Sequence, residues 1–349
     1  MFSFYVTAQA LSKMVQLESD EYEILKKQNC VYVELDDSEI ESCRDKYYSQ
    51  EISELNLFMA LEISDCEIKH SDAIMKVKSN PETLSEYADS VFVLDIDEIK
   101  ANNIRAQYGV LVLSQDNIDL SSLMACDYYP CVKHEKGNWN DVLTKINAIP
   151  FNTILINDRN LFKDIEIIGN ETHHFGIENL KSFLDSMLSH RRPCSNMPIH
   201  VFVGFDLSTV TQNFSKLNKE LLRSLSEIIR NTKIVIELVA YQGSSSFWDD
   251  SHNRWIVTNY GHITVDHKIS IFQKDNKACV DQDINYHSLY SMGLNDHNPS
   301  KLPKRSRDVK IQRIKAIMKD VLTRPEDYKY SINGEISSSD KIQNRLLVP

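Results

Sequence analysis

Glycine is scarce in this chain, with 9 among 349 residues, and nowhere does it cluster as in the phosphate-binding loops of nucleotide-binding proteins. This excludes the Walker and dinucleotide-binding loops, which need grouped glycines to bring the backbone close to phosphate. A nucleophile elbow is also absent. No run approaches the roughly 18 apolar residues of a membrane span. Met1–Leu17 has neither the basic lead nor the small-residue cleavage site of a secretory signal.

Cysteine occurs seven times but at irregular spacings, which favours free thiols in a reducing compartment over a disulfide framework. Cys126, Cys131 and His134 lie within nine positions, yet their spacing is not that of a zinc site and no second Cys/His pair lies close by. We therefore predict no metal and no cofactor. With no leader and no membrane span, the chain is predicted to be a cytoplasmic protein that makes no membrane contact.

Acidic and basic residues are unevenly distributed. The net charge of -11 comprises -13 in residues 1–100, with 9 Lys and Arg against 22 Asp and Glu. Residues 299–324 carry +7, with 9 Lys and Arg against 2 Asp and Glu. The acidic part is poorly suited to binding phosphate backbones. It predicts either a solubilising surface or a face on which a protein partner docks.

A strand, helix and second strand follow one another in the first half of the chain. Val91–Leu94 and Val110–Leu113 have the apolar pattern of buried strands, and Glu98–Tyr108 between them is a helix pattern that ends at Gly109. Short links between such elements predict parallel, neighbouring strands. The length favours about two domains, and we place the first, an acidic α/β domain, over residues 1–148.

The second half alternates strands with amphipathic helices more clearly. We predict strands at Thr153–Ile156, His200–Phe205 and Lys233–Tyr241, with a helix between each pair. The predicted fold class is α/β, with two sheet-based layered domains and flanking helices. The second domain covers residues 149–298, and a basic linker, helix and tail cover residues 299–349. Six strand positions are predicted to lie in the second core: Ile154, Val201, Val203, Val235, Ile236 and Ile256.

The stretch with the most specific chemistry is a strand pattern that follows a polar loop and ends at Gly261. His252 and Arg254 stand two residues apart at its head, so they share one face of the strand. An imidazole beside a guanidinium forms an anion site, and phosphate is the commonest anion bound in this way. The sequence alone leaves open whether the pair binds a ligand or only hydrogen-bonds its own loop.

The order of elements and the His-x-Arg pair together resemble half of a phospholipase D-like fold, over about residues 150–275. The signature of that superfamily is His-x-Lys and, after four further residues, Asp. His252 stands at the position of the nucleophile, Arg254 at that of the Lys and Asn259 at that of the Asp. The resemblance therefore implies a degenerate domain that binds phosphate through Arg254 and Asn259. It also implies a prokaryotic nucleic-acid-handling or antiviral defence setting.

Two further groups of residues would complete such a site. Asp158 and Arg159 follow a predicted strand, at the edge where open α/β sheets place their ligands. Asp158 is a candidate to orient an imidazole and Arg159 to bind phosphate. Asp250, like Asp249, precedes His252 closely enough to orient its ring; capping a turn is the alternative role for either residue.

A basic helix is predicted over Val309–Leu322, with apolar residues on its inner face. The basic patch on and before it comprises Lys304, Arg305, Arg307, Lys310 and Arg313. These charges are either solvated or bind phosphates or an acidic protein surface.

Three functional hypotheses follow from these residues. The first is a non-hydrolytic protein that binds phosphate or nucleic acid, because Asn259 cannot supply the negative charge that supports a catalytic imidazolium. The second is a phosphodiesterase or nuclease in which a homodimer pairs two His252 side chains. The third is a non-catalytic interaction subunit with a protein partner.

Overall fold

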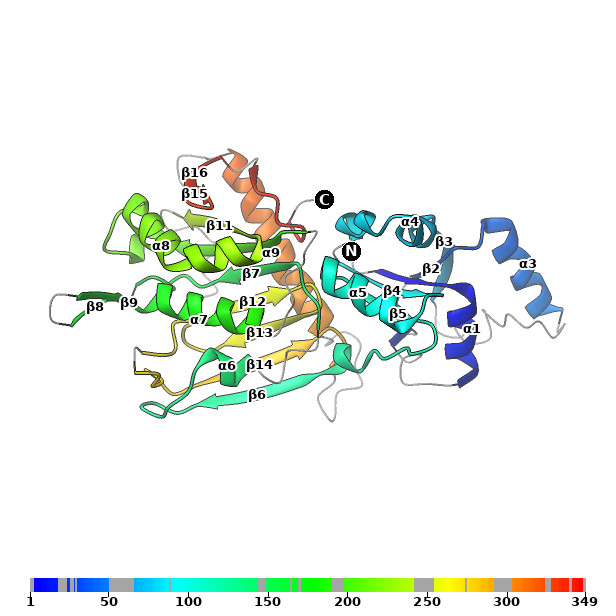
Figure 1. Ribbon diagram of the computed structural model, residues 1–349, viewed down its shortest axis with the longest axis horizontal. Helices are drawn as coiled ribbons and strands as arrows, with labels where there is room; N and C mark the ends of the chain where they lie inside the picture. The colour runs from blue at the N-terminus through cyan, green and yellow to red at the C-terminus, as the bar shows by residue number, and fades with distance from the viewer. Residues whose placement is uncertain are drawn as a thin grey trace. The chain divides into compact units, whose positions relative to one another are not determined.

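The computed structural model describes most of the chain and divides it into two units, Met1–Ser122 and Leu123–Pro349. The described residues are 3–17, 24–25, 28, 30–49, 66–87, 89–143, 149–163, 165–168, 171–189, 197–241, 254–273, 275–291, 303–323, 328–338 and 341–347. Both units are mixed α/β structures built on a sheet (Figure 1). No described helix combines the length and apolar character needed to cross a bilayer. Six of the seven cysteines lie in the described ranges, and none of the six forms a disulfide.

The first unit is a parallel five-stranded sheet in the order β3-β2-β1-β4-β5. Its strands are β1 (Ser3–Val6), β2 (Cys30–Val33), β3 (Glu67–His70), β4 (Ser90–Leu94) and β5 (Leu111–Ser114). Its helices are α1 (Ala8–Leu17), α3 (Asp37–Tyr48), α4 (Ala73–Ser79) and α5 (Glu98–Tyr108), and a 3-10 turn covers Pro81–Tyr87.

The predicted strand-helix-strand unit of the first half is confirmed, because β4 and β5 are parallel neighbours with Val91 opposite Leu111. Helix α5 begins where the Asp97 side chain accepts a hydrogen bond from the Lys100 amide. It ends at Gly109, whose φ of 64° lies in the left-handed region that favours glycine.

The second unit contains a nine-stranded sheet in the order β16-β15-β11-β10-β7-β12-β13-β14-β6. Its strands are β6 (Cys126–Cys131), β7 (Thr153–Asn157), β10 (Ile199–Asp206), β11 (Ile234–Tyr241), β12 (Arg254–Thr258), β13 (Gly261–Val265), β14 (Gln282–Ser288), β15 (Tyr328–Ile332) and β16 (Glu335–Ile336). A separate hairpin pairs β8 (Ile165–Ile168) with β9 (Glu171–His174). Strands β7, β10 and β11 are parallel to one another, and the remaining pairings of the large sheet are antiparallel.

Helices cover both faces of this sheet, with α7 and α8 in front and α9 behind in Figure 1. The helices of the unit are α6 (Trp139–Leu143), α7 (Phe175–Ser189), α8 (Phe214–Thr232) and α9 (Pro303–Thr323). Helix α8 begins where the Asn213 side chain accepts from the Lys216 amide, and its buried positions include Leu217, Leu221, Leu225 and Ile228. This three- and four-residue spacing is the amphipathic pattern expected of a helix that covers a sheet.

Five of the six predicted core residues are buried: Ile154, Val201, Val203, Ile236 and Ile256. Val235 differs, because it is only partly buried and lines a cavity. The reason is its place in the sheet, since β11 is followed by β15 and the short β16, which leave part of this face uncovered.

The domain boundaries also differ from the expected ones at 148/149 and 298/299. The first division falls after Ser122 because β6 pairs with β14 and so belongs to the second sheet. The expected linker and tail after residue 298 join the same unit, since α9 begins at Pro303 and β15 pairs with β11. Pairings between strands this far apart in sequence leave no local signal.

Candidate phosphate-binding site

Charged residues from three strands meet at one edge of the nine-stranded sheet. Asp158 and Arg159 follow β7, and Asp206 ends β10, which runs parallel to β7. Strand β12 is antiparallel to β7 and pairs Trp255 with Asn157, so Arg254 begins β12 at the same edge. We call Asp158, Arg159, Asp206 and Arg254 the strand-end cluster.

Asp158 is the buried anchor of the strand-end cluster, with a fully inaccessible side chain. Its Oδ2 accepts from the Ile269 amide at 2.8 Å and its Oδ1 accepts from the Asn160 amide at 2.9 Å. Burial raises the pKa of this carboxyl, while the two amide hydrogen bonds and the charge of Arg254 act in the opposite direction.

Arg254 lies against Asp158 and is 14% exposed. Its Nε is 3.5 Å from Asp158 Oδ1, an ion-pair distance that lacks hydrogen-bond geometry, so we treat this contact as electrostatic. Its Nη1 donates to the Asp266 carbonyl oxygen at 3.0 Å. Backbone and carboxylate together therefore fix the position of this guanidinium.

Arg159 makes the second arginine–carboxylate contact of the cluster. Its Nε donates to Asp206 Oδ2 at 3.0 Å, and the Asp206 side chain is fully buried. The other oxygen of Asp206 accepts from the amide and the hydroxyl of Ser208. The buried Asp206 carboxylate therefore orients this guanidinium, and 46% of the Arg159 side chain remains open to solvent.

Asn259 does not join the cluster, contrary to its predicted role in phosphate binding. It lies beyond the far end of β12 and is completely buried. Its Oδ1 accepts from the Asn152 and Thr153 amides, and its Nδ2 donates to Asn152 Oδ1. The amide group therefore joins β12 to the start of β7. His252 and Asp250 lie outside the described residues.

The basic patch on α9 is also distributed differently from the prediction. Arg307 is fully buried, and its Nε donates to the Thr258 carbonyl oxygen, so it packs the helix against β12. Arg305 and Arg313 are exposed, whereas Lys304 and Lys310 are partly buried. The Lys304 amide donates to the Leu289 carbonyl oxygen, just after the end of β14. Since β12 and β14 both run antiparallel to β13, the end of β14 and the first turn of α9 lie at the edge of the sheet opposite to Arg254.

Comparisons with known proteins give no family. No protein-family model matches the chain, and none of the curated proteins matches it. Among solved structures, one of an Argonaute from Aquifex aeolicus aligns with 84% of this chain and 43% of its own length, at 9% identity and a TM-score of 0.14. The chain thus spans less than half of that structure, and a likeness at this TM-score carries no argument.

Asp206 was missed by the sequence reasoning, although the rule that selected Asp158 applies to it. Asp206 directly follows the predicted strand His200–Phe205. It therefore lies at the carboxyl edge, where parallel strands place polar side chains. The signal was therefore present, as an acid directly after a buried strand.

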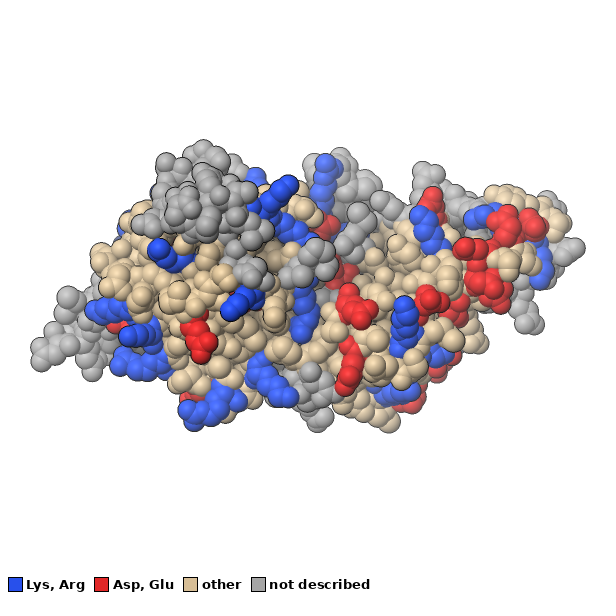
Figure 2. All heavy atoms as spheres, turned by 90° about the horizontal axis from the view of Figure 1, so that it is seen from above, with Lys and Arg blue, Asp and Glu red and all other residues tan. Residues whose placement is uncertain are grey.

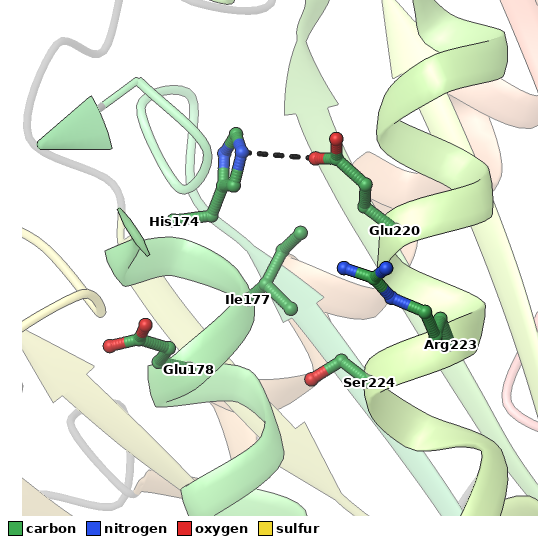
Figure 3. A pocket seen from close by; sticks show the side chains of 6 residues that line it. All are labelled: His174, Ile177, Glu178, Glu220, Arg223 and Ser224. Carbon is green, nitrogen blue, oxygen red and sulfur yellow. Dashed lines mark ion pairs between the residues drawn. The ribbon is translucent and has the colours of Figure 1, made fainter. Parts of the chain in front are cut away.

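A second polar group that the sequence did not indicate lies between α7 and α8 (Figure 3). His174 Nε2 is 3.0 Å from Glu220 Oε2, and Arg223 and Ser224 project from α8 into the same pocket of about 440 Å³. Gln212 Nε2 is 3.3 Å from Glu220 Oε2 and 3.5 Å from His174 Nδ1. These contacts connect the end of β9, just before α7, to α8, and so brace the two segments against each other.

Within the described ranges no group of three or more His, Cys, Asp or Glu side chains could hold a metal ion. Cys126, His287 and His262 lie in one row across β6, β14 and β13, with Cys126 Sγ 3.4 Å from His287 Nδ1. The His262 and His287 rings are stacked, 5.6 Å apart.

His262 should make the second unit sensitive to acid. It is 4% exposed, and burial, Lys310, His287 and Arg307 lower its pKa from 6.5 to about 2. The unfolded chain takes up this proton at a higher pH than the folded chain does. The stability that the neutral imidazole contributes is therefore fully present above pH 6.5 and is lost as the pH falls toward 2. At pH 4.5 the loss is ~3 kcal/mol at 1.36 kcal/mol per pH unit.

The measurement is urea unfolding of the wild type and of His262→Phe at pH 7 and pH 4.5. The Phe variant keeps the aromatic stacking but cannot titrate, so its unfolding free energy should fall less between the two pH values. An equal fall in both proteins would show that other groups cause the acid sensitivity.

Proposed function

We propose that the second unit binds a phosphate-bearing ligand, with nucleic acid the leading candidate, at the strand-end cluster. The observation that carries the proposal is the pair of guanidinium groups at one sheet edge, each held by a fully buried carboxylate. Arginine is well suited to this task because its planar fork matches the oxygens of phosphate. An arginine already fixed in place loses less side-chain entropy when it binds.

The charge distribution supports the second unit over the first as the phosphate-binding part. Residues 1–122 carry 10 Lys and Arg against 24 Asp and Glu, a net charge of -14, whereas residues 123–349 carry 29 against 26, a net charge of +3. Figure 2 shows the same contrast, with many Lys and Arg side chains over the second unit and Asp and Glu gathered on the first. Exposed Arg305, Arg313 and Lys319 on α9 would add to the attraction for a long polyanion.

The phospholipase D-like resemblance enters the proposal as a degenerate site that binds without hydrolysis. Arg254 takes the place of the family's Lys and lies in the strand-end cluster. Asn259, at the place of the family's Asp, has its amide group engaged in packing. Both features favour binding over cleavage, and a nuclease would instead depend on His252.

The test compares Arg159→Gln with a charge-matched control at the other edge of the sheet. Lys233→Asn removes one positive charge where β11 begins, and Asn tolerates the left-handed backbone of that residue (φ 49°). Loss of one charge-assisted phosphate contact should weaken binding of a fluorescent single-stranded DNA or RNA about tenfold, ~1.4 kcal/mol. The control should change it by less than about twofold.

Fluorescence anisotropy at rising salt supplies the second readout, since affinity that depends on released counterions falls as salt increases. Wild-type protein that neither retains nor cuts DNA or RNA at low salt would overturn the proposal and favour the interaction-subunit hypothesis. If the wild type cuts nucleic acid and His252→Ala does not, the nuclease hypothesis replaces the binding proposal.

A further inference from the structure

A thiol and an imidazole face each other where β6 pairs with β14. Cys126 begins β6 and stands directly opposite His287 of β14, with its Sγ 3.4 Å from His287 Nδ1. The backbone holds this register, because the Ser288 amide donates to the Ala125 carbonyl oxygen. Since β14 runs parallel to β12, the pair lies at the edge of the sheet opposite to Arg254 and is separate from the strand-end cluster.

Cys126 is the accessible thiol in the part of the chain that the structure describes. It is exposed, whereas the other five described cysteines are buried or partly buried: Cys30, Cys43, Cys66, Cys131 and Cys279. A small molecule in solution can therefore reach this side chain.

The Cys126 thiol needs a base in order to react. Burial raises its pKa, and the charge of Asp127 acts in the same direction, so little thiolate exists at pH 7. The thiolate is the nucleophilic form of cysteine. A thiol of this kind therefore reacts slowly unless a neighbouring group accepts its proton during the attack.

His287 is placed to accept that proton. Burial lowers its pKa, and the charge of Lys310 on α9 acts in the same direction, so the imidazole is neutral at pH 7. Ser291 Oγ lies 3.4 Å from the same Nδ1 and donates its own proton to the Ser288 carbonyl oxygen. It can therefore accept a hydrogen bond from Nδ1 once that nitrogen is protonated. The His262 ring of β13 stacks on His287 and supports its orientation.

We propose that Cys126 is a site of covalent modification by small disulfides, with His287 as the base that accepts the thiol proton. As the proton moves from Sγ to Nδ1, Sγ bonds to one sulfur of the disulfide R–S–S–R and the S–S bond breaks. The leaving thiolate takes the proton from His287 and departs as the thiol RSH. The products are a mixed disulfide on Cys126 and one free thiol, so the exchange needs no further oxidant.

The experiment treats the full chain with bis(2-hydroxyethyl) disulfide, an uncharged reagent, at pH 7 and follows the mass of the intact protein over time. We expect peptide mapping to place the first adduct on Cys126. His287→Gln should slow its formation by at least about tenfold, since a positioned base commonly contributes more than this. The control is Cys43→Ser, which removes a partly buried thiol on α3 and should leave the rate unchanged.

The pH dependence of the rate separates a base from a histidine that only supports the fold. Without a base the rate follows the thiolate fraction and falls about tenfold per pH unit below the pKa of the thiol. His287→Gln should show this fall between pH 8 and pH 6.5. The wild-type rate should fall less, because the lowered pKa of His287 keeps Nδ1 able to accept a proton over this range.

Should His287→Gln fail to fold, the wild-type pH profile decides alone. A first adduct on another cysteine, an equal rate in His287→Gln, or a tenfold fall per pH unit in the wild type would each overturn the proposal. These outcomes are independent of the nucleic-acid measurement, because Arg159 and Arg254 are unchanged.

Discussion

Ile256→Asp should unfold the second unit. Ile256 is fully buried in the middle of β12, between Ile156 of β7 and Ile263 of β13. An aspartate there would be an unpaired charge in an apolar layer, which costs several kcal/mol. Since whole domains are stable by only about 5–15 kcal/mol, a loss of this size removes most of the folded population.

Far-UV circular dichroism and urea unfolding at pH 7 measure this effect. The matched control is Val309→Asp on α9, which is 48% exposed and should change the unfolding free energy by less than about 0.5 kcal/mol. Val235→Asp should lie between the two, since Val235 is partly buried and borders a cavity that can hold water. A folded Ile256→Asp protein with wild-type stability would show that the sheet assigned around β12 is wrong.

Local periodicity was sufficient to predict the three parallel strands of the second unit and the helices between them, but not β6, β13, β14, β15 or β16. The strands predicted at Thr153–Ile156, His200–Phe205 and Lys233–Tyr241 correspond to β7, β10 and β11. Each is a short apolar run bounded by turn residues, and the helices between them have a clear apolar face. The signal lies within each segment and needs no information from the rest of the chain.

The order of strands within the sheet could not be predicted in this way. Strand β6 lies next to β14 and β15 lies next to β11, although each pair is separated by more than 80 residues. Pairing of this kind depends on contacts between segments far apart in the chain, which leave no local pattern in either strand. For that reason the expected boundaries differ from the division after Ser122.

Burial of polar groups limited the prediction of the site. Asp158, Arg159 and Arg254 lie at one edge of the sheet, although the sequence suggested a strand-end position only for Asp158 and Arg159. Arg307 and Asn259 carry the right functional groups, but each is buried and bonded to the backbone of the sheet. A sequence pattern gives the type of a side chain, whereas its hydrogen-bond partners come from segments far away in the chain.

Asp158→Asn should destabilise the second unit although the two side chains have almost the same shape. Both oxygens of Asp158 accept hydrogen bonds from backbone amides, one from Ile269 and one from Asn160. An asparagine would place its NH₂ group against one of these amides, so that two donors face each other. The charge opposite Arg254 would also be lost.

We expect a loss of about 3–5 kcal/mol, the range for breaking a buried pair on one side. Urea unfolding at pH 7 gives the value, with Asp275→Asn as the control. Asp275 is exposed and, within the described ranges, forms an ion pair with Lys277, so its replacement should cost less than about 1 kcal/mol. Equal stabilities of wild type and Asp158→Asn would mean that the two amide contacts do not anchor the strand-end cluster.

The pH dependence of the same variant tests the electrostatics of the cluster. Burial raises the folded-state pKa of Asp158 above the ordinary value of 3.8, so the wild type gains stability from the protonated carboxyl in acid. That contribution is fully present below pH 3.8 and is lost as pH rises through the raised pKa. Asparagine cannot titrate, and the difference between wild type and Asp158→Asn should therefore be larger in acid than at pH 7. A difference that instead grew with rising pH would mean that the charge of Arg254 outweighs burial, and that Asp158 holds its arginine as a fully ionised partner.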